Sequence, residues 1–485
     1  MRKTFEPQMV LGGISIEQAQ IPTKSRDEFP QYLRAMQYIF TTKELSDKLF
    51  DILKKTLCTK KRTGRTGMEL WSIFVLAGAR LCLNIDYDRL HYLSNEDNLL
   101  RQILGVHDGL IRGRSFERQT IIDNVSLIDE STLREINLLI LGAGHKELKK
   151  KETEALHIKV DSFVTEANVH FPTDYNLLWD SGRKSIDVLE ALMKTDEAYC
   201  SGWRKIVYWR KKLKNKMLIL SRATADKSKN RATRIENATK DYLFTARSLS
   251  GKISTAKQIK TLDILSESML THLRYYHQML DKHIDLVERR LMKNEKIAHE
   301  EKVFSIFEPW VEWISKGKAH KPVELGKRTC ITTDQWHFIV DWCVADHQQD
   351  NQMLLSVIDR IRQSFEVSRC SCDKGFFSRI DVDIIDLFNI HTIIPKKGKR
   401  SISDIKKESA PEFIKGKRAH SAVESNINEL EHRGLDRCPD KGIKGFHRYV
   451  GLAVIAYNLR RLGQILLKKD IKEAERKAVK FRQAA

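Results

Sequence analysis

The sequence predicts an α+β / α/β chain: a mixed β-sheet flanked by helices, with an all-α N-terminal domain and a long all-α insertion after the first core strand. The order of apolar patterns along the chain predicts this. Apolar residues recur at helical spacing through the first 150 residues, alternate with polar residues over 156–161, and return to helical spacing over 183–301. Segments of β type reappear after residue 302. Loop-closure entropy grows only logarithmically with length, so a long insertion can interrupt one sheet at little cost.

The N-terminal helices follow from caps and apolar spacing. Thr41 and Glu44 fit a capping box, which predicts a helix beginning beside them. Residues 68–83 are apolar on most faces, which predicts a buried helix. Further helices are expected over 86–93, 99–104, 115–122 and 131–141.

The later part of the chain predicts strands and then helices. The first strand covers 156–161, and Asp334-Gln335 breaks the apolar run 328–344 into a hairpin. The other expected strands are 302–307, 366–372 and 389–394. A basic loop is expected over 397–417, and helices over 351–364, 419–433 and 447–469.

The charge is concentrated in two segments. The 485 residues include 85 Lys and Arg against 64 Asp and Glu, a net charge of +21. Residues 396–485 hold 23 basic and 11 acidic side chains, and residues 203–234 hold 12 and 1, so the rest of the chain is nearly neutral. Two cationic segments on a nearly neutral chain favour binding of a nucleic acid. The alternatives are a basic face that contacts only solvent and a patch that binds a membrane surface.

Several classes of protein are disfavoured. The longest apolar stretch, residues 70–79, is about half of the roughly 20 residues of a membrane span, and no secretory leader is expected. Eight cysteines without small-domain spacing favour a reducing cytosol. Cys370 and Cys372 have no second pair at zinc-ligand spacing, and we interpret them as alternate positions of a buried strand.

Three acidic residues suggest a metal site. Asp161 stands at the expected end of the first strand, Asp373 follows a later strand, and Glu424 lies about one turn inside an expected helix. Each alone is ordinary, as a turn residue or a solvent-facing helix residue. Brought together, they would repel one another unless cations lay between them. Mg²⁺ suits such oxygen ligands, and two ions about 4 Å apart can activate the attacking oxygen and stabilise the leaving one.

The sequences around these residues strengthen that hypothesis. The blocks that matter are Val160 to Asp174 with Leu177 to Asp180, Lys302 to Pro309 with Val323 to Gly326, Cys372 to Ser378 with Ile394 to Lys399, and Ala422 to Leu430 with Leu435 to Cys438. In them the chain resembles the insertion-sequence DDE transposases, most closely the group called ISNCY, over most of residues 60–465. It departs from the usual pattern at Lys374, where Arg is usual, and at Glu431-His432, where Lys-Arg is common.

The resemblance implies an RNase H-like catalytic core with Asp161, Asp373 and Glu424 as catalytic and metal-binding residues for Mg²⁺ or Mn²⁺, two ions per site. It implies cleavage of DNA at terminal inverted repeats and transfer of the freed 3′-hydroxyl into target DNA. The partners are then double-stranded DNA and other copies of the chain, as a homodimer or higher oligomer. The implied location is the cytoplasm of a prokaryote, at the nucleoid, with no membrane partner.

Basic residues near these blocks are candidates for DNA contact, with a plain solvated surface as the alternative. The aromatics among the cations of 203–216 are expected to pack in the core of the insertion rather than to stack on bases. The candidate DNA-binding residues are Arg204, Lys211, Lys212, Lys396, Lys397, Lys399, Arg400, Arg418, His420 and Arg433.

The expected domain organisation follows these patterns. Residues 1–150 form a helical domain for end recognition or dimerisation, and 183–301 form the helical insertion. Residues 151–182 and 302–465 form the catalytic core, and 466–485 a basic tail. Two other functions stay open: a decayed or repurposed transposase that only binds DNA, and an RNase H-like nuclease acting on branched or hybrid substrates.

Overall fold

The computed structural model describes residues 2–5, 13–58, 67–106, 113–195, 197–200, 203, 205–258, 264–315 and 322–484. It divides into two compact units. The first contains Met1–Asn168 and Ile314–Ala485, and the second contains Val169–Trp313. The expected class is confirmed at the level of a mixed sheet with many helices.

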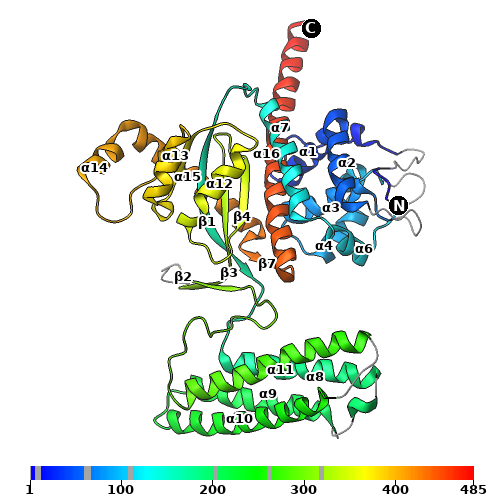
Figure 1. Ribbon diagram of the computed structural model, residues 1–485. Coiled ribbons are helices and arrows are strands. Elements are labelled where there is room, and N and C mark those ends of the chain that lie inside the picture. Colours follow the sequence, from blue (N-terminus) through cyan, green and yellow to red (C-terminus); the bar gives the residue numbers. More distant parts are fainter. Residues whose placement is uncertain are drawn as a thin grey trace. The chain divides into compact units, whose positions relative to one another are not determined.

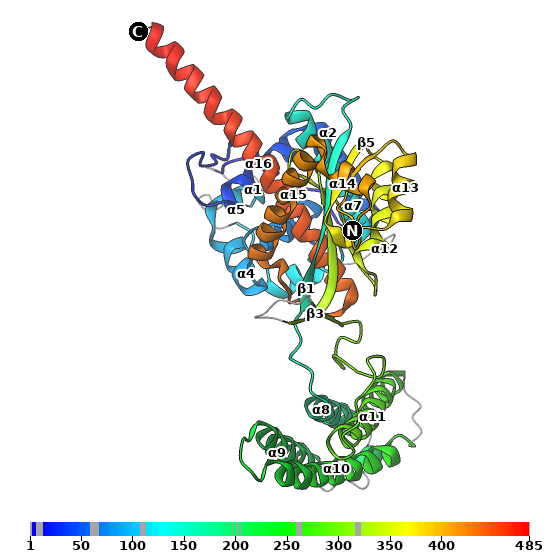
Figure 2. The same cartoon turned by 90° about the vertical axis from the view of Figure 1, so that its left-hand side faces the viewer.

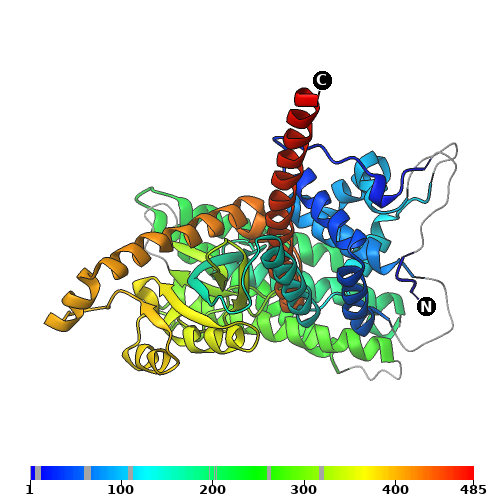
Figure 3. The ribbon, with the colours of Figure 1, turned by 90° about the horizontal axis from the view of Figure 1, so that it is seen from above.

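Several of the N-terminal helices pack on one long helix, α16 (Gly442–Ala484), which lies between this helical part and the sheet (Figures 1 and 3). All thirteen residues of α3 are buried, which confirms the buried helix expected over 68–83. The N-terminal helices are α1 (Phe29–Thr41), α2 (Lys43–Leu57), α3 (Leu70–Cys82), α4 (Tyr87–Glu96), α5 (Asn98–Ile103), α6 (Arg118–Val125) and α7 (Glu130–Glu147).

Within the described residues, Gly442–Lys480 is the one helix long and apolar enough to cross a membrane, and 89% of its most apolar window is buried in the protein. Such burial is what a core helix shows.

The first unit is built on a mixed sheet with β1 (Leu156–Ala167) in its interior. β1 pairs antiparallel with β3 and parallel with β5 and β7, while β3 pairs antiparallel with β4, and β5 parallel with β6. The order across the sheet is β2-β3-β1-β5-β6. The other strands are β2 (Glu312–Ser315), β3 (Val323–Thr333), β4 (Ile339–Val344), β5 (Val367–Cys372), β6 (His391–Ile393) and β7 (Arg437–Cys438).

Helices cover both faces of this sheet. Figure 2 shows the sheet nearly edge-on, with α15 (Pro411–Leu430) on one side and α12 (Asp350–Arg362) and α13 (Arg379–Leu387) on the other. Hydrogen bonds agree with this view, since Ser371 of β5 contacts His420 of α15. Ser162 of β1, which points to the opposite face, contacts Asp350 of α12.

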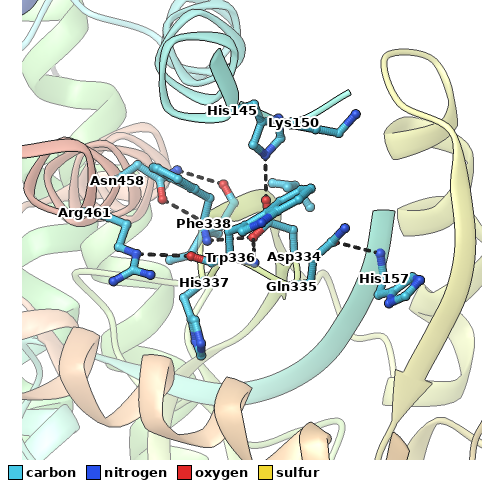
Figure 4. Close-up of polar contacts among 12 residues, drawn as sticks. His145, Lys150, His157, Asp334, Gln335, Trp336, His337, Phe338, Asn458 and Arg461 are labelled. Carbon is cyan, nitrogen blue, oxygen red and sulfur yellow. Dashed lines mark hydrogen bonds and ion pairs between the residues drawn. The ribbon is translucent and has the colours of Figure 1, made fainter. Parts of the chain in front are cut away.

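The β3–β4 turn is tied to both α7 and α16 (Figure 4). Asp334 is fully buried, and its carboxylate accepts hydrogen bonds from the backbone N–H groups of Trp336 and Phe338 and contacts Nε2 of His145 at 2.7 Å. The side chain of Asn458 on α16 bonds both the N–H and the C=O of Ile339, where β4 begins. These bonds satisfy buried polar groups at the point where the helical body meets the sheet.

The second unit is a bundle of four helices. Buried Leu, Ile, Ala and Tyr side chains from all four form its core. The helices are α8 (Asp174–Thr195), α9 (Ile206–Ala225), α10 (Arg231–Ala256) and α11 (Ile264–Leu291). The insertion therefore becomes helical at Asp174, earlier than the expected residue 183.

Two expected elements are wrong. Residues 302–307 form no strand, because the Ser305 hydroxyl accepts from the backbone of Phe307 and Glu308 and turns the chain. Residues 397–417 are largely helical instead of a loop, because Ser401 caps α14 (Ile402–Ser409) and Pro411 begins α15. Helix α13 and the short strands β2 and β7 were not expected.

Gly326 allows β1 and β3 to approach closely. A Cβ at this position would lie 2.0 Å from the carbonyl oxygen of Thr165. We expect Gly326→Ala to destabilise the protein by at least about 1–3 kcal/mol, because the backbone itself must move. Thermal unfolding checks this, with Gly142→Ala as control, since a Cβ at Gly142 of α7 meets nothing within 4 Å. Equal unfolding temperatures for the two variants would contradict the close approach.

Candidate functional site

Two of the three predicted carboxylates lie side by side on neighbouring parallel strands. Val160 of β1 pairs with Cys372 of β5, and Asp161 and Asp373 are the residues that follow. Asp161 is not at the end of its strand as expected, because β1 continues to pair with β3 as far as Glu166 and Gly326. It stands where the pairing with β5 ends, so one side of the strand opens at this residue.

The third carboxylate comes from a helix packed on these strands. Glu424 belongs to α15, which contacts β1 and β5. The helix begins at Pro411, so Glu424 lies well inside it rather than one turn from its start. Gly416 lets α15 approach the sheet, since a Cβ there would lie 2.1 Å from Cδ1 of Ile393. The side chains of Glu424 and Asp373 are exposed, whereas Asp161 is partly buried.

The charges of the other two carboxylates act on Asp161. The pKa of Asp161 is raised to about 6, first by burial and then by the negative charges of Asp373, Glu424 and Asp350. The backbone N–H of Ser162, which donates to Oδ1 of Asp161 at 2.7 Å, lowers the pKa in part. A cation placed beside Asp161 would offset the effect of these negative charges.

The donor set fits a hard divalent cation. Asp161, Asp373 and Glu424 offer only carboxylate oxygens, which suit Mg²⁺ and Mn²⁺. The nearby thiol of Cys372 is buried. Because successive side chains of a strand alternate, it points to the face of the sheet opposite to that of Asp161 and Asp373. Cys370 is buried on the same face as Cys372, and their Sγ atoms lie 3.7 Å apart. This confirms that the two cysteines occupy alternate positions of a buried strand.

His420 lies one turn before Glu424 and is buried between α15 and β5. Its Nδ1 lies 3.2 Å from the hydroxyl of Ser371. Burial lowers its pKa to about 4, although the charge of Asp373 acts in the opposite sense. Burial therefore favours the neutral ring, which packs between α15 and the sheet.

The other predicted DNA-binding residues of the first unit differ in exposure and in whether they pair with acidic residues. Lys397, Lys399 and Arg418 are exposed. By contrast, Lys396 pairs with Asp404, Arg400 pairs with Glu408 at 3.3 Å, and Arg433 donates to the carbonyl of Cys82 and pairs with Glu28. Each of these three cations already pairs with an acidic residue, although the Arg400 side chain is still 50% exposed.

In the second unit, Lys211 is exposed and the ammonium of Lys212 lies 5.4 Å from the ring centre of Trp209. Trp203 and Trp209 pack against the bundle core, which confirms the expectation that aromatics of this segment are core residues. Tyr208 is the exception, with 58% of its surface exposed. Arg204 lies outside the described residues.

A fourth acidic residue, Asp350, lies near Asp161 and was not predicted from the sequence. Asp350 begins α12, and its charge contributes to the raised pKa of Asp161. An acidic residue at a helix start is common, because it is stabilised by the helix dipole. No motif distinguished Asp350 from other such residues.

Comparison of the chain with protein-family models, with curated proteins and with solved structures found no match.

Proposed function

We propose that the chain is a DDE transposase of an insertion sequence, with an RNase H-like core that cleaves DNA at terminal inverted repeats and joins the ends to target DNA. The observation that carries this proposal is that Asp161 and Asp373 follow paired positions of two adjacent parallel strands, while Glu424 lies on the helix packed on those strands. The negative charges of Asp373 and Glu424 both raise the pKa of Asp161. These residues are 212 and 51 positions apart in the sequence, so it is the fold that brings them to the same part of the sheet.

The three side chains differ in burial, and we assign them different roles in holding cations. Asp161 is partly buried and held by the N–H of Ser162, so it can fix a cation against the sheet. Asp373 and Glu424 are exposed and can hold cations where a DNA backbone can reach them. Two bound Mg²⁺ or Mn²⁺ ions would supply charge stabilisation for in-line displacement at a phosphodiester. No covalent protein intermediate is needed for this chemistry.

Exposed cations in the same unit support a DNA substrate. Lys397 and Lys399 lie between β6 and α14, and Arg418 lies on α15, the helix that carries Glu424. Contacts of this type position the DNA backbone and carry no base readout.

We expect the double variant Lys397→Ala/Lys399→Ala to bind all DNA sequences more weakly. Its plot of log affinity against log salt should be shallower by about 2, since each phosphate contact contributes a slope of roughly 0.9. Fluorescence anisotropy at several salt concentrations measures the slope. Lys48→Ala/Lys54→Ala is the control, because both lysines already pair with acids of their own helix α2. An unchanged slope in the first variant would remove these lysines from the DNA interface.

The proposed function is tested with purified protein and a labelled duplex from the DNA that flanks its gene, in Mg²⁺ and in EDTA. We expect metal-dependent nicking at the end of a terminal repeat. Binding without nicking would favour the DNA-binding protein that lacks catalysis. Cleavage that follows branched or hybrid structure and ignores the end sequence would favour the nuclease alternative.

A further inference from the structure

Asp350 makes contacts that its place at a helix start does not require. Its Oδ1 accepts a hydrogen bond from the hydroxyl of Ser162 at 2.6 Å and one from the guanidinium of Arg328, also at 2.6 Å. The N-terminal residue of a helix usually uses its carboxylate on the helix's own N–H groups or on solvent. Here the carboxylate instead connects α12 to β1 and β3.

These contacts reach both segments that carry the aspartates, the middle of β1 and the turn after β5. Ser162 directly follows Asp161, and its backbone N–H holds Oδ1 of Asp161. On the β5 side, a Cβ at Gly375 would lie 3.0 Å from Oδ2 of Asp350, so the turn after Asp373 passes directly against this carboxylate. Asp350 is thus a shared support for the two segments whose separation sets the distance between Asp161 and Asp373.

The position of Asp350 favours support over direct metal binding. Successive side chains of a strand point to opposite faces, so Asp161 and Ser162 project on opposite sides of the sheet. Asp350 bonds Ser162, on the α12 side, whereas Glu424 comes from α15 on the other side. The pair of Asp350 with Arg328 is also largely enclosed, with 21% and 19% of the two side chains exposed.

We infer that Asp350 is a positioning residue, which through Ser162 and the Gly375 turn fixes Asp161 and Asp373 at the spacing that divalent cations require. This inference rests on the proposed function, because it assumes that the three carboxylates bind metal. Outer-sphere partners of metal ligands typically change metal affinity by about 10–100-fold when removed. Asp350 is expected to act in that range.

The test is the dissociation constant of Mn²⁺, measured by electron paramagnetic resonance on the full chain, beside thermal unfolding in EDTA. Asp350→Ala should weaken Mn²⁺ binding by about 10–100-fold. Asp350→Asn retains an acceptor for the Ser162 hydroxyl and should lose less Mn²⁺ affinity than Asp350→Ala. Ser162→Ala should weaken binding and Ser162→Thr, which keeps the hydroxyl, should restore it.

Asp470→Asn is the matched control. Asp470 pairs with Arg34 at 2.7 Å, and this ion pair is also partly buried, with 34% and 21% of the two side chains exposed. This variant should lower the unfolding temperature without changing Mn²⁺ affinity.

Two results would overturn the inference. Mn²⁺ affinity of Asp350→Ala within twofold of the wild type would reduce Asp350 to a structural ion pair, whatever its effect on unfolding. Loss of one bound ion with unchanged affinity for the other would make Asp350 a direct ligand. If Asp350→Ala does not fold, Asp350→Asn and Ser162→Ala decide. A wild type that binds no Mn²⁺ would instead contradict the proposed function itself.

Discussion

Asp373→Asn is expected to reduce metal-dependent nicking by about 10³-fold or more while DNA binding is kept. The amide removes a charged ligand from the site, and the charge stabilisation that metal ions supply is worth several kcal/mol, each 1.4 kcal/mol being tenfold in rate. DNA binding should survive, because we propose that it depends on basic residues such as Lys397 and Lys399. Single-turnover nicking and anisotropy on the same duplex measure the two effects separately.

Asp383→Asn provides the comparison for this variant. Asp383 lies on the neighbouring helix α13, is exposed, and pairs with Arg379 at 3.3 Å. Its replacement should leave the nicking rate within about twofold. A large loss in both variants, or in neither, would contradict a specific role for Asp373.

Asp161→Asn is expected to stabilise the metal-free protein, by about 1–3 kcal/mol at pH 7–8. The pKa of Asp161 is raised to about 6 by burial and by Asp373, Glu424 and Asp350, and one pKa unit corresponds to about 1.4 kcal/mol. The expected stabilisation extends below the free energy that the full pKa shift would give, because the Asp161 side chain keeps some contact with solvent. The amide keeps the Oδ1 acceptor for the N–H of Ser162 and removes the charge.

The pH dependence of this difference has a definite sign. Between pH 4 and 6 the folded state binds more protons at Asp161 than the unfolded state does, so the wild type loses stability as the pH rises through this window. The advantage of Asp161→Asn should therefore be absent near pH 4 and complete above about pH 6. Chemical denaturation in EDTA at pH 4.5 and 7.5 measures it.

Addition of Mg²⁺ should reverse this order. The wild type gains stability by binding the ion in its folded state, whereas Asp161→Asn gains little. A variant that is less stable than the wild type in EDTA at pH 7.5 would show that Asp161 is a favourable structural contact and not an unpaired buried charge.

Elements with strong local signals could be predicted from the sequence. The buried α3, the hairpin of β3 and β4, and strand β5 follow from apolar runs bounded by polar breaks. The strand expected over 302–307 was wrong because one hydroxyl, that of Ser305, turns an apolar segment. The loop expected in place of helix α14 was wrong, because the prediction followed the high positive charge of this segment and missed the capping box of Ser401 and Asp404.

The candidate site could be predicted only in part. Asp161, Asp373 and Glu424 were identified by the sequence around them, and the register of β1 with β5 is what brings the first two together. Nothing local could show that Arg433 binds Glu28 or that His420 is buried, since both depend on contacts with distant segments. Asp350 was missed for the same reason, because its partners Ser162 and Arg328 lie in other elements.

The central claim is that Asp161, Asp373 and Glu424 together hold divalent cations. The most direct measurement is the number of Mn²⁺ ions bound per chain, by electron paramagnetic resonance, in the wild type and in Asp161→Asn/Asp373→Asn/Glu424→Gln. We expect two ions in the wild type and none at comparable affinity in the triple variant, with both proteins folded by circular dichroism. Equal binding by the two proteins, or no binding by the wild type, would contradict the claim.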